Sequence, residues 1–277
     1  MANIISSDFF RLRKGKTIKG VLIGIICVLL VTAVLLKVFS SDWFLDRMIN
    51  TSTGTSGFGI SMELDESDLQ DLEQLQVFEV HDGTEYMASM MSESAELLLV
   101  LILPFIIAVF GGDYASGAFR NLLSYHSKRK NIYIAKLLTT SIVAVLLTIA
   151  FEVLSWLTGT VFFGFGNSIG LRLVNMLPGT LLMLPRIIDF ISIGQGVIAF
   201  TKKTGTTIAI YLIGMICWAL VIQVVAMFFP GVSWIMNLDL TTMLGLIFDY
   251  TSLSLQSILT PTIFSIIIIA VTTIAGM

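Results

Sequence analysis

The sequence is poor in charged residues, cysteine and histidine, and each shortage excludes a class of protein. Only 13% of the 277 residues are charged, 56% are hydrophobic, and the mean hydropathy is +0.92. Soluble domains are about 25% charged and about 45–50% apolar, so the composition predicts an integral membrane protein. Cys27 and Cys217 both lie in apolar runs and give no disulfide framework, so we expect them to pack as small apolar residues. The two histidines form no metal-ligand pattern, and no metal site is predicted.

A phosphate-binding loop is also missing. Gly112 and Gly117 have the G-x-x-x-x-G spacing, but Ala118 and Phe119 follow where Lys and Ser or Thr would bind phosphate and magnesium. Residues 54–57 read GTSG, the pattern around an intramembrane serine nucleophile, yet neither histidine is placed to act as its base. We therefore expect the chain to be neither an enzyme nor a cofactor-binding protein.

Six apolar runs are long enough to cross a bilayer core of about 30 Å, which takes about 20 helical residues. They lie at Val21–Phe39, Met87–Phe110, Leu137–Phe163, Val174–Phe200, Thr206–Phe229 and Ile258–Met277. The uninterrupted part of the second run, Leu97–Phe110, is too short alone, so we expect that helix to begin among the methionines at 87–91. Pro104 is expected to kink it. The prediction is one all-α transmembrane domain, residues 1–277, with six transmembrane helices.

The placement of charge predicts the orientation. Cytoplasmic loops of membrane proteins carry an excess of Lys and Arg, and a basic cluster precedes the first span: Arg11, Arg13, Lys14, Lys16 and Lys19. This puts the N-terminus in the cytoplasm. The segment from Ser40 to Glu96 then lies outside, and it holds 13 of the 19 acidic residues. The chain is predicted to be a multi-pass protein of the plasma membrane.

Three segments outside the spans have distinct compositions. Residues 1–19 place Phe9 and Phe10 among basic side chains, which favours a helix in the membrane interface, with a plain topogenic cluster as the alternative. Residues 40–86 form an acidic outer loop whose leucine spacing predicts a small extracellular helix. Its acidity could attract a cationic substrate or only keep the surface solvated. Residues 230–257 are apolar for a loop, and we expect short extracellular helices there.

Three charged residues fall near the middle of predicted spans. Glu152 lies just past the middle of the third span, and Arg186 and Asp189 lie one helical turn apart near the middle of the fourth. Intramembrane charges are costly and usually face a bundle interior or an aqueous cavity. These residues are interpreted either as a neutralised network that fixes the packing of two helices, or as a path for substrate or protons.

The stretch from Gly111 to Lys136, between the second and third predicted spans, has the size of a short helix with a basic tail. The segment contains, in this order, an acidic residue (Asp113), Ser-Gly (Ser116, Gly117), an arginine (Arg120), Leu-Leu-Ser (122–124), a basic run (128–130) and a lysine (Lys136). This pattern resembles the cytoplasmic coupling segment after the second span in permeases of ABC-2-type transporters. Members usually carry a glutamate where Asp113 stands. The resemblance extends over the whole chain, including the N-terminal helix, the six spans and the outer first loop.

The resemblance implies the transmembrane subunit of an ATP-driven exporter, whose residues 111–136 dock into a separate ATPase. The residues it assigns to coupling are Asp113, Ser116, Gly117, Arg120, Asn121, Arg129 and Lys136. ATP and magnesium would be held by the ATPase. Two permease chains, identical or paralogous, would assemble with two ATPases in a bacterial membrane, surrounded by lipid and without nucleic acid as a partner.

Within that family, the chain is similar to small exporters of antimicrobial or amphipathic peptides, including phenol-soluble modulins, and to lantibiotic-immunity permeases. A peptide cargo is therefore implied, with lipid, drug and polysaccharide as the other cargoes. From the residues alone, a proton-coupled secondary transporter that uses Glu152, Arg186 and Asp189 is the main alternative, although the inverted repeats typical of that class are not visible. A non-transporting immunity or sensor protein would leave the basic segment without a purpose.

Overall fold

The computed structural model of the chain describes residues 2–39, 41, 80–93, 95–124, 129–165, 169–229 and 255–276. Every regular element in these ranges is a helix. In chain order they are α1 (Ala2–Lys14), α2 (Thr17–Phe39), α5 (Gly83–Glu93), α6 (Ala95–Ile106), η2 (Ile107–Gly111), α7 (Gly112–Ala115), α8 (Ala118–Ser124), α9 (Arg129–Phe163), α10 (Ile169–Thr201), α11 (Thr204–Phe228) and α13 (Leu255–Gly276). The predicted all-α fold is confirmed for these residues.

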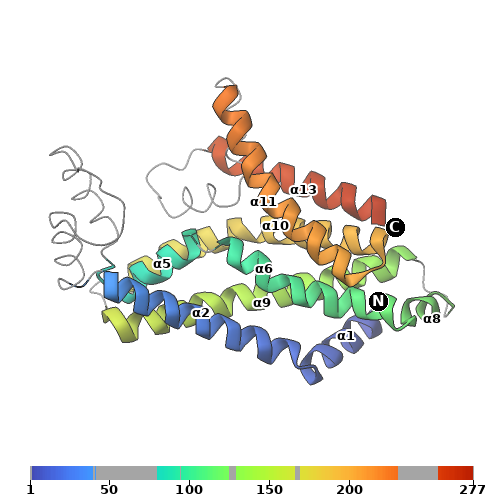
Figure 1. Cartoon of the computed structure of the whole chain (residues 1–277), viewed down its shortest axis with the longest axis horizontal. Coiled ribbons are helices and arrows are strands. Elements are labelled where there is room, and N and C mark those ends of the chain that lie inside the picture. The colour runs from blue at the N-terminus through green and yellow to red at the C-terminus, as the bar shows by residue number, and fades with distance from the viewer. Residues whose placement is uncertain are drawn as a thin grey trace, which may run out of the picture.

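Helix α9 is the central element of the bundle. Its 35 residues span about 52 Å at 1.5 Å per residue, and it contacts α1, α2, α5, α6, η2, α10 and α13. Figure 1 shows α2, α6 and α9 running lengthwise beside one another, with α11 and α13 together on the opposite side from α2. The apolar core lies where these helices meet and includes Ile25, Leu29, Ile102, Ile106 and Phe151.

Among the described residues, five segments are long and apolar enough to cross a membrane: Thr17–Phe39, Leu97–Tyr114, Arg129–Phe163, Met183–Thr201 and Thr204–Phe228. They correspond to the first five predicted spans. The sixth predicted span lies within α13, which is 22 residues long and whose described side chains include a shorter apolar stretch, Thr262–Ala275. Six spans were expected, and length and apolar composition support five. Large apolar side chains are exposed along these helices, for example Leu146 and Ile213, as expected for surfaces that face lipid.

The second span reaches its length differently from the prediction. Helix α5 does begin before the methionines at 87–91, but the apolar segment itself is Leu97–Tyr114, because the chain remains helical beyond Phe110. Pro104 lies inside α6, and the helix changes to a π-helical turn, η2, just after it. Gly111 is the last residue of this turn, and its backbone lies close to the side chain of Thr204 on α11. A Cβ atom on Gly111 would lie 2.7 Å from Thr204 Cγ2.

Helices α5 and α9 make a close contact through two glycines. A Cβ atom on Gly83 would lie 2.5 Å from the backbone nitrogen of Thr160, and one on Gly159 would lie 2.8 Å from the carbonyl oxygen of Gly83. The contact places the hydroxyl of Tyr86 where it donates a hydrogen bond of 2.7 Å to the carbonyl of Leu29 on α2. Small residues thus let α5 and α9 meet at backbone distance, and the side chain of Tyr86 links this contact to α2.

Several predictions fall outside the described residues. These are the acidic loop at 40–86 up to residue 79, the GTSG stretch, and the loop at 230–257 up to residue 254. The N-terminal helix is present as α1, and a short helix in the predicted coupling segment is present as α8. The prediction for the two cysteines was wrong in part: both are unpaired, but both are exposed on α2 and α11 instead of packed.

Candidate functional site

The segment between the second and third spans begins with α7 and α8. Helix α7 continues directly from the π-helical turn, and the chain then turns at Gly117, whose φ of +70° lies in the left-handed region that favours glycine. Helix α8 follows, and residues 125–128 lie outside the described part. The turn at Gly117 therefore sets the direction in which α8 leaves the span.

Two of the residues that the resemblance assigns to coupling, Asp113 and Lys136, are buried and paired with each other. Asp113 is 3% exposed and Lys136 is 0% exposed, and the carboxylate of Asp113 forms an ion pair with the ammonium of Lys136. Asp113 lies in α7 and Lys136 in the second turn of α9. The pair therefore joins the two ends of the segment between the second and third spans beneath its surface.

Helix α1 supplies the other two charges of this group. Arg11 forms an ion pair and a hydrogen bond with Asp113, and Asp8 lies 3.3 Å from the ammonium of Lys136. Arg11 and Asp8 also pair with each other at 3.2 Å. We refer to Asp8, Arg11, Asp113 and Lys136 as the charge cluster. It ties α1, α7 and α9 together with two positive and two negative charges.

The π-helical turn provides acceptors for the same cations. Arg11 donates to the carbonyls of Ala108 and Val109 at 2.9 and 3.0 Å, and Lys136 donates to Val109 at 2.8 Å. An ammonium carries three N–H donors, and Lys136 has three acceptor groups in Asp8, Asp113 and Val109. The irregular backbone of η2 thus completes the cluster, in line with the frequent placement of π-turns at functional sites.

The environment of Asp8 opposes its ionisation. Burial raises the pKa of the Asp8 carboxyl above its ordinary value of 3.8, against the opposing effect of Lys136 and Arg11, while Asp113 adds to the rise. Asp8 itself is 5% exposed. Arg11 differs from the other three members because its side chain remains 42% exposed. The cluster therefore reaches the surface through Arg11 alone among its four members.

The remaining predicted coupling residues lie at the surface. Ser116 and Asn121 are exposed on the α7–α8 segment, and Arg129 is exposed at the start of α9, followed by Lys130. The side chain of Arg120 lies outside the described part. The predicted set thus divides into an inner pair, Asp113 and Lys136, and an outer surface around α8.

Within the bundle, Arg186 and Asp189 form an ion pair of 3.8 Å on α10, and both are nearly fully buried. Glu152 on α9 accepts a hydrogen bond from the hydroxyl of Thr180 on α10 at 2.5 Å. Arg186 and Asp189 thus pair with each other within α10, and Glu152 has a polar partner on the neighbouring helix.

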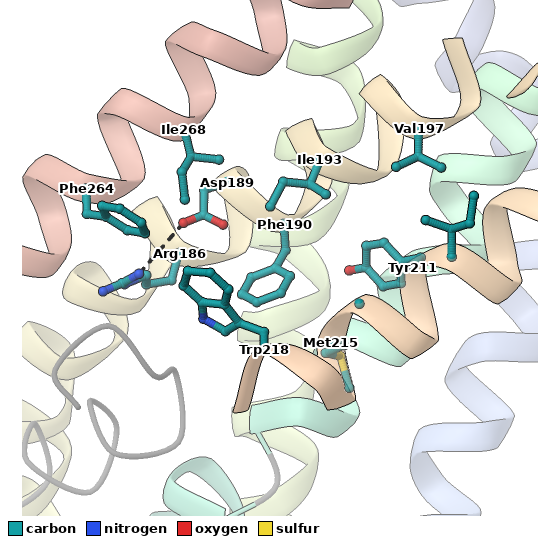
Figure 2. A pocket seen from close by; sticks show the side chains of 12 residues that line it. Arg186, Asp189, Phe190, Ile193, Val197, Tyr211, Met215, Trp218, Phe264 and Ile268 are labelled. Carbon is teal, nitrogen blue, oxygen red and sulfur yellow. Dashed lines mark ion pairs between the residues drawn. The ribbon is translucent and has the colours of Figure 1, made fainter. Parts of the chain in front are cut away.

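Arg186 and Asp189 also line a cavity of about 240 Å³ between α10, α11 and α13. Figure 2 shows the ion pair at one end of it and Val197 and Tyr211 at the other. Four aromatic rings contribute to the wall: Phe190, Tyr211, Trp218 and Phe264. Trp218 and Phe264 are stacked with ring centroids 6.0 Å apart. The cavity thus combines one ion pair with an otherwise apolar, aromatic lining.

Asp8 and Arg11 were not predicted as partners of Asp113 and Lys136. Asp8 is an acidic residue within the basic N-terminal cluster, and its spacing of three from Arg11 was the available signal. Gln195 was missed as well. It is fully buried on α10 and donates to the carbonyl of Lys136 at 3.3 Å and to the hydroxyl of Thr140 at 3.1 Å, so it connects α10 to α9 beside the cluster.

The fold and these sites define the class: an all-helical protein with several helices suited to cross a membrane, carrying a buried charge cluster at the start of one long helix. Among the described residues, no group of three or more His, Cys, Asp or Glu is arranged to hold a metal ion. No protein-family model, no curated protein and no solved structure matches the chain.

Proposed function

We propose that this chain is the transmembrane permease subunit of an ATP-driven exporter. A separate ATPase would dock on the surface around α8 and supply the energy, because the chain itself carries no phosphate-binding loop at Gly112–Gly117. The proposed cargo is an amphipathic or antimicrobial-type peptide, and lipid, drug and polysaccharide are the other cargoes.

The observation that carries the proposal is the charge cluster. A coupling segment must transmit a displacement of its surface to the helices of the membrane domain. It must also keep its own shape while it does so. Asp113 and Lys136 pair beneath that surface, and Arg11 and Asp8 extend the same set of contacts to α1. A displacement of α8 would therefore move α1 and α9 together, as in bistable packed elements that transmit a signal between sites.

The division between buried and exposed residues supports the same role. The buried pair gives the segment a fixed shape, while Ser116, Asn121 and Arg129 remain exposed for a partner. We propose two permease chains with two ATPases as the assembly. A peptide cargo would reach the bundle from the membrane interface, where amphipathic helices partition with their apolar face buried.

Co-expression with a phosphate-loop ATPase from the same cell tests the proposal. The isolated chain should not hydrolyse ATP, and the pair should purify as a stable complex with ATPase activity. Arg129→Glu should weaken co-purification, whereas Lys19→Glu, which also reverses an exposed cation, should not. Both variants must elute as folded protein in detergent. ATP hydrolysis by the isolated chain, or equal binding by both variants, would contradict the proposal.

Cysteine labelling tests the orientation that the proposal requires. With Cys27 and Cys217 replaced by alanine, Ser124→Cys places a thiol at an exposed position of α8. A membrane-impermeant maleimide should label it in inside-out vesicles and not in intact cells. Labelling in intact cells would put α8 outside and exclude docking to a cytoplasmic ATPase.

A proton-coupled secondary transporter is the second candidate, because Arg186 and Asp189 line a cavity within the bundle. In reconstituted vesicles, such a transporter would respond to an imposed pH gradient without ATP. The exporter would instead require its ATPase and ATP. Neutralising both Arg186 and Asp189 would abolish transport driven by the gradient if these charges carried the proton.

A further inference from the structure

The cavity between α10, α11 and α13 has the size of a small aromatic group with a short polar arm. Its volume is about 240 Å³, and a cavity of about 150 Å³ lined by apolar side chains is sufficient to bind benzene. Phe190, Met215 and Trp218 on its wall are half-buried, and Gly214 at its edge is exposed. The cavity therefore has an opening on the side of α11, toward the surface that meets lipid.

The lining favours an aromatic occupant. The rings of Phe190, Trp218 and Phe264 surround the space next to the ion pair (Figure 2), and Met215 adds a flexible thioether. Aromatic pairs gain stability beyond the burial of their area, and thioether sulfur makes favourable contacts with rings. An aromatic ring in the cavity would therefore make favourable contacts with these rings and with the thioether that an alkyl chain cannot make.

The ion pair selects the polar part of the ligand. Arg186 supplies N–H donors and Asp189 supplies acceptor oxygens at the same end of the cavity. A ligand that carries a net charge would leave one of these two charges unbalanced inside the membrane, which is costly. A neutral amide has one donor and one acceptor, so it complements both residues without changing the net charge.

We propose that this cavity binds one aromatic side chain of a peptide together with its backbone amide, which enters beside Gly214. The biological cargo rests on the proposed export function, but the binding site belongs to the isolated chain. Figure 2 shows the arrangement that this requires: the rings around Phe190, and the ion pair at the end where the amide would lie.

The probe is N-acetyl-4-fluorophenylalaninamide, titrated by ¹⁹F NMR against the isolated chain in lipid nanodiscs, with empty nanodiscs as the blank for partition into lipid. Binding should saturate, and unlabelled N-acetylphenylalaninamide should compete. N-acetylglycinamide, which keeps the amide but lacks the ring, should not compete at equal concentration. 3-Phenylpropylamine, which carries a positive charge at neutral pH, should compete more weakly than the neutral amide.

Two glycine variants locate the site. A Cβ atom on Gly214 meets nothing within 4 Å, and the same holds for Gly24 on α2, far from the cavity. Gly214→Leu should fill the opening and lower the affinity at least about tenfold, the lower end of what an apolar pocket gains from its contacts. Gly24→Leu should bind as the wild type does. The double variant Arg186→Leu/Asp189→Leu should bind the ring but lose the preference for the amide over 3-phenylpropylamine.

Three results would overturn the inference. Equal affinity in Gly214→Leu and the wild type would place the ligand elsewhere. Tighter binding of 3-phenylpropylamine than of the amide would exclude a neutral head group. Competition by a lipid acyl chain such as dodecane, with no effect of N-acetylphenylalaninamide, would make the cavity a lipid site. All of these binding experiments use the chain without an ATPase. A negative result would therefore contradict the binding site without bearing on the co-purification that tests the exporter.

Discussion

Lys136 and Asp113 form a buried ion pair that closes the two ends of the segment between the second and third spans. The pattern of the sequence assigns both residues to coupling with an ATPase. Because both side chains are buried, we expect them to hold the segment in shape and not to contact a partner directly. Coupling would then depend on the rigidity of a packed element, which transmits displacement because packed interiors have low compressibility.

Replacing Lys136 with methionine should be strongly destabilising. The substitution keeps a long side chain but removes one of the two cations, Lys136 and Arg11, that Asp8 and Asp113 share, and breaking a buried pair on one side costs about 3–5 kcal/mol. Thermal unfolding in detergent measures this loss. Lys130→Met, an exposed position on the same helix, is the matched control and should stay within about 0.5 kcal/mol of the wild type. A similar small effect for both variants would contradict the pairing.

The pH dependence of stability should depend on Asp8. Burial raises the pKa of Asp8 in the folded chain above its ordinary value of 3.8. Between 3.8 and the raised pKa, the folded chain therefore binds more protons at this site than the unfolded chain does, so stability falls as pH rises. The contribution of Asp8 is complete below pH 3.8 and is lost as pH rises through the raised pKa.

Asp8→Asn removes that titration and tests its sign. The difference in melting temperature between Asp8→Asn and the wild type should change through this window, with the variant gaining relative to the wild type as pH rises. Parallel melting profiles for Asp8→Asn and the wild type would contradict the raised pKa.

The helices could be predicted because they depend on composition over long windows. Five of the six predicted spans meet the requirement of length and apolar content, and their approximate limits follow from runs of apolar residues. The sixth is shorter in its apolar part, and the second extends past Phe110, because the π-helical turn after Pro104 continues the helix where the sequence shows only two glycines. Local backbone irregularities of this kind have no fixed pattern in sequence.

The charge cluster could be predicted only in part. Asp113 and Lys136 were identified from a pattern of residues, but the pattern contains no information on burial. Their partners on α1 are more than a hundred positions away in sequence, and a basic N-terminal segment is fully explained by membrane topology. Which charges meet is decided by the packing of α1 on α9, and packing depends on shape complementarity that a single sequence does not display.

The Arg186–Asp189 pair should behave as a unit. Arg186→Leu leaves Asp189 buried without its ion-pair partner and should lower stability by about 3–5 kcal/mol, whereas the double variant Arg186→Leu/Asp189→Leu should recover most of the loss. Glu152→Gln should have a smaller effect, because an amide can still accept the hydrogen bond from Thr180. Thermal unfolding of the three variants in detergent measures these losses of stability. Strictly additive losses in the double variant would exclude an energetic pairing.

Two glycine-to-alanine variants should change stability in opposite directions. At Gly159 the new methyl group would lie 2.8 Å from the carbonyl oxygen of Gly83 and 2.8 Å from Tyr86 Cβ. These atoms belong to or adjoin the backbone of α5 and cannot rotate away, so α5 and α9 must separate, at a cost of about 1–3 kcal/mol for overpacking. At Gly24 the methyl group meets nothing within 4 Å, and alanine should stabilise α2 by up to about 1 kcal/mol because it favours the helix. Melting temperatures in detergent should therefore fall for Gly159→Ala and rise for Gly24→Ala, and a rise for both would show that α5 does not pack on α9 at backbone distance.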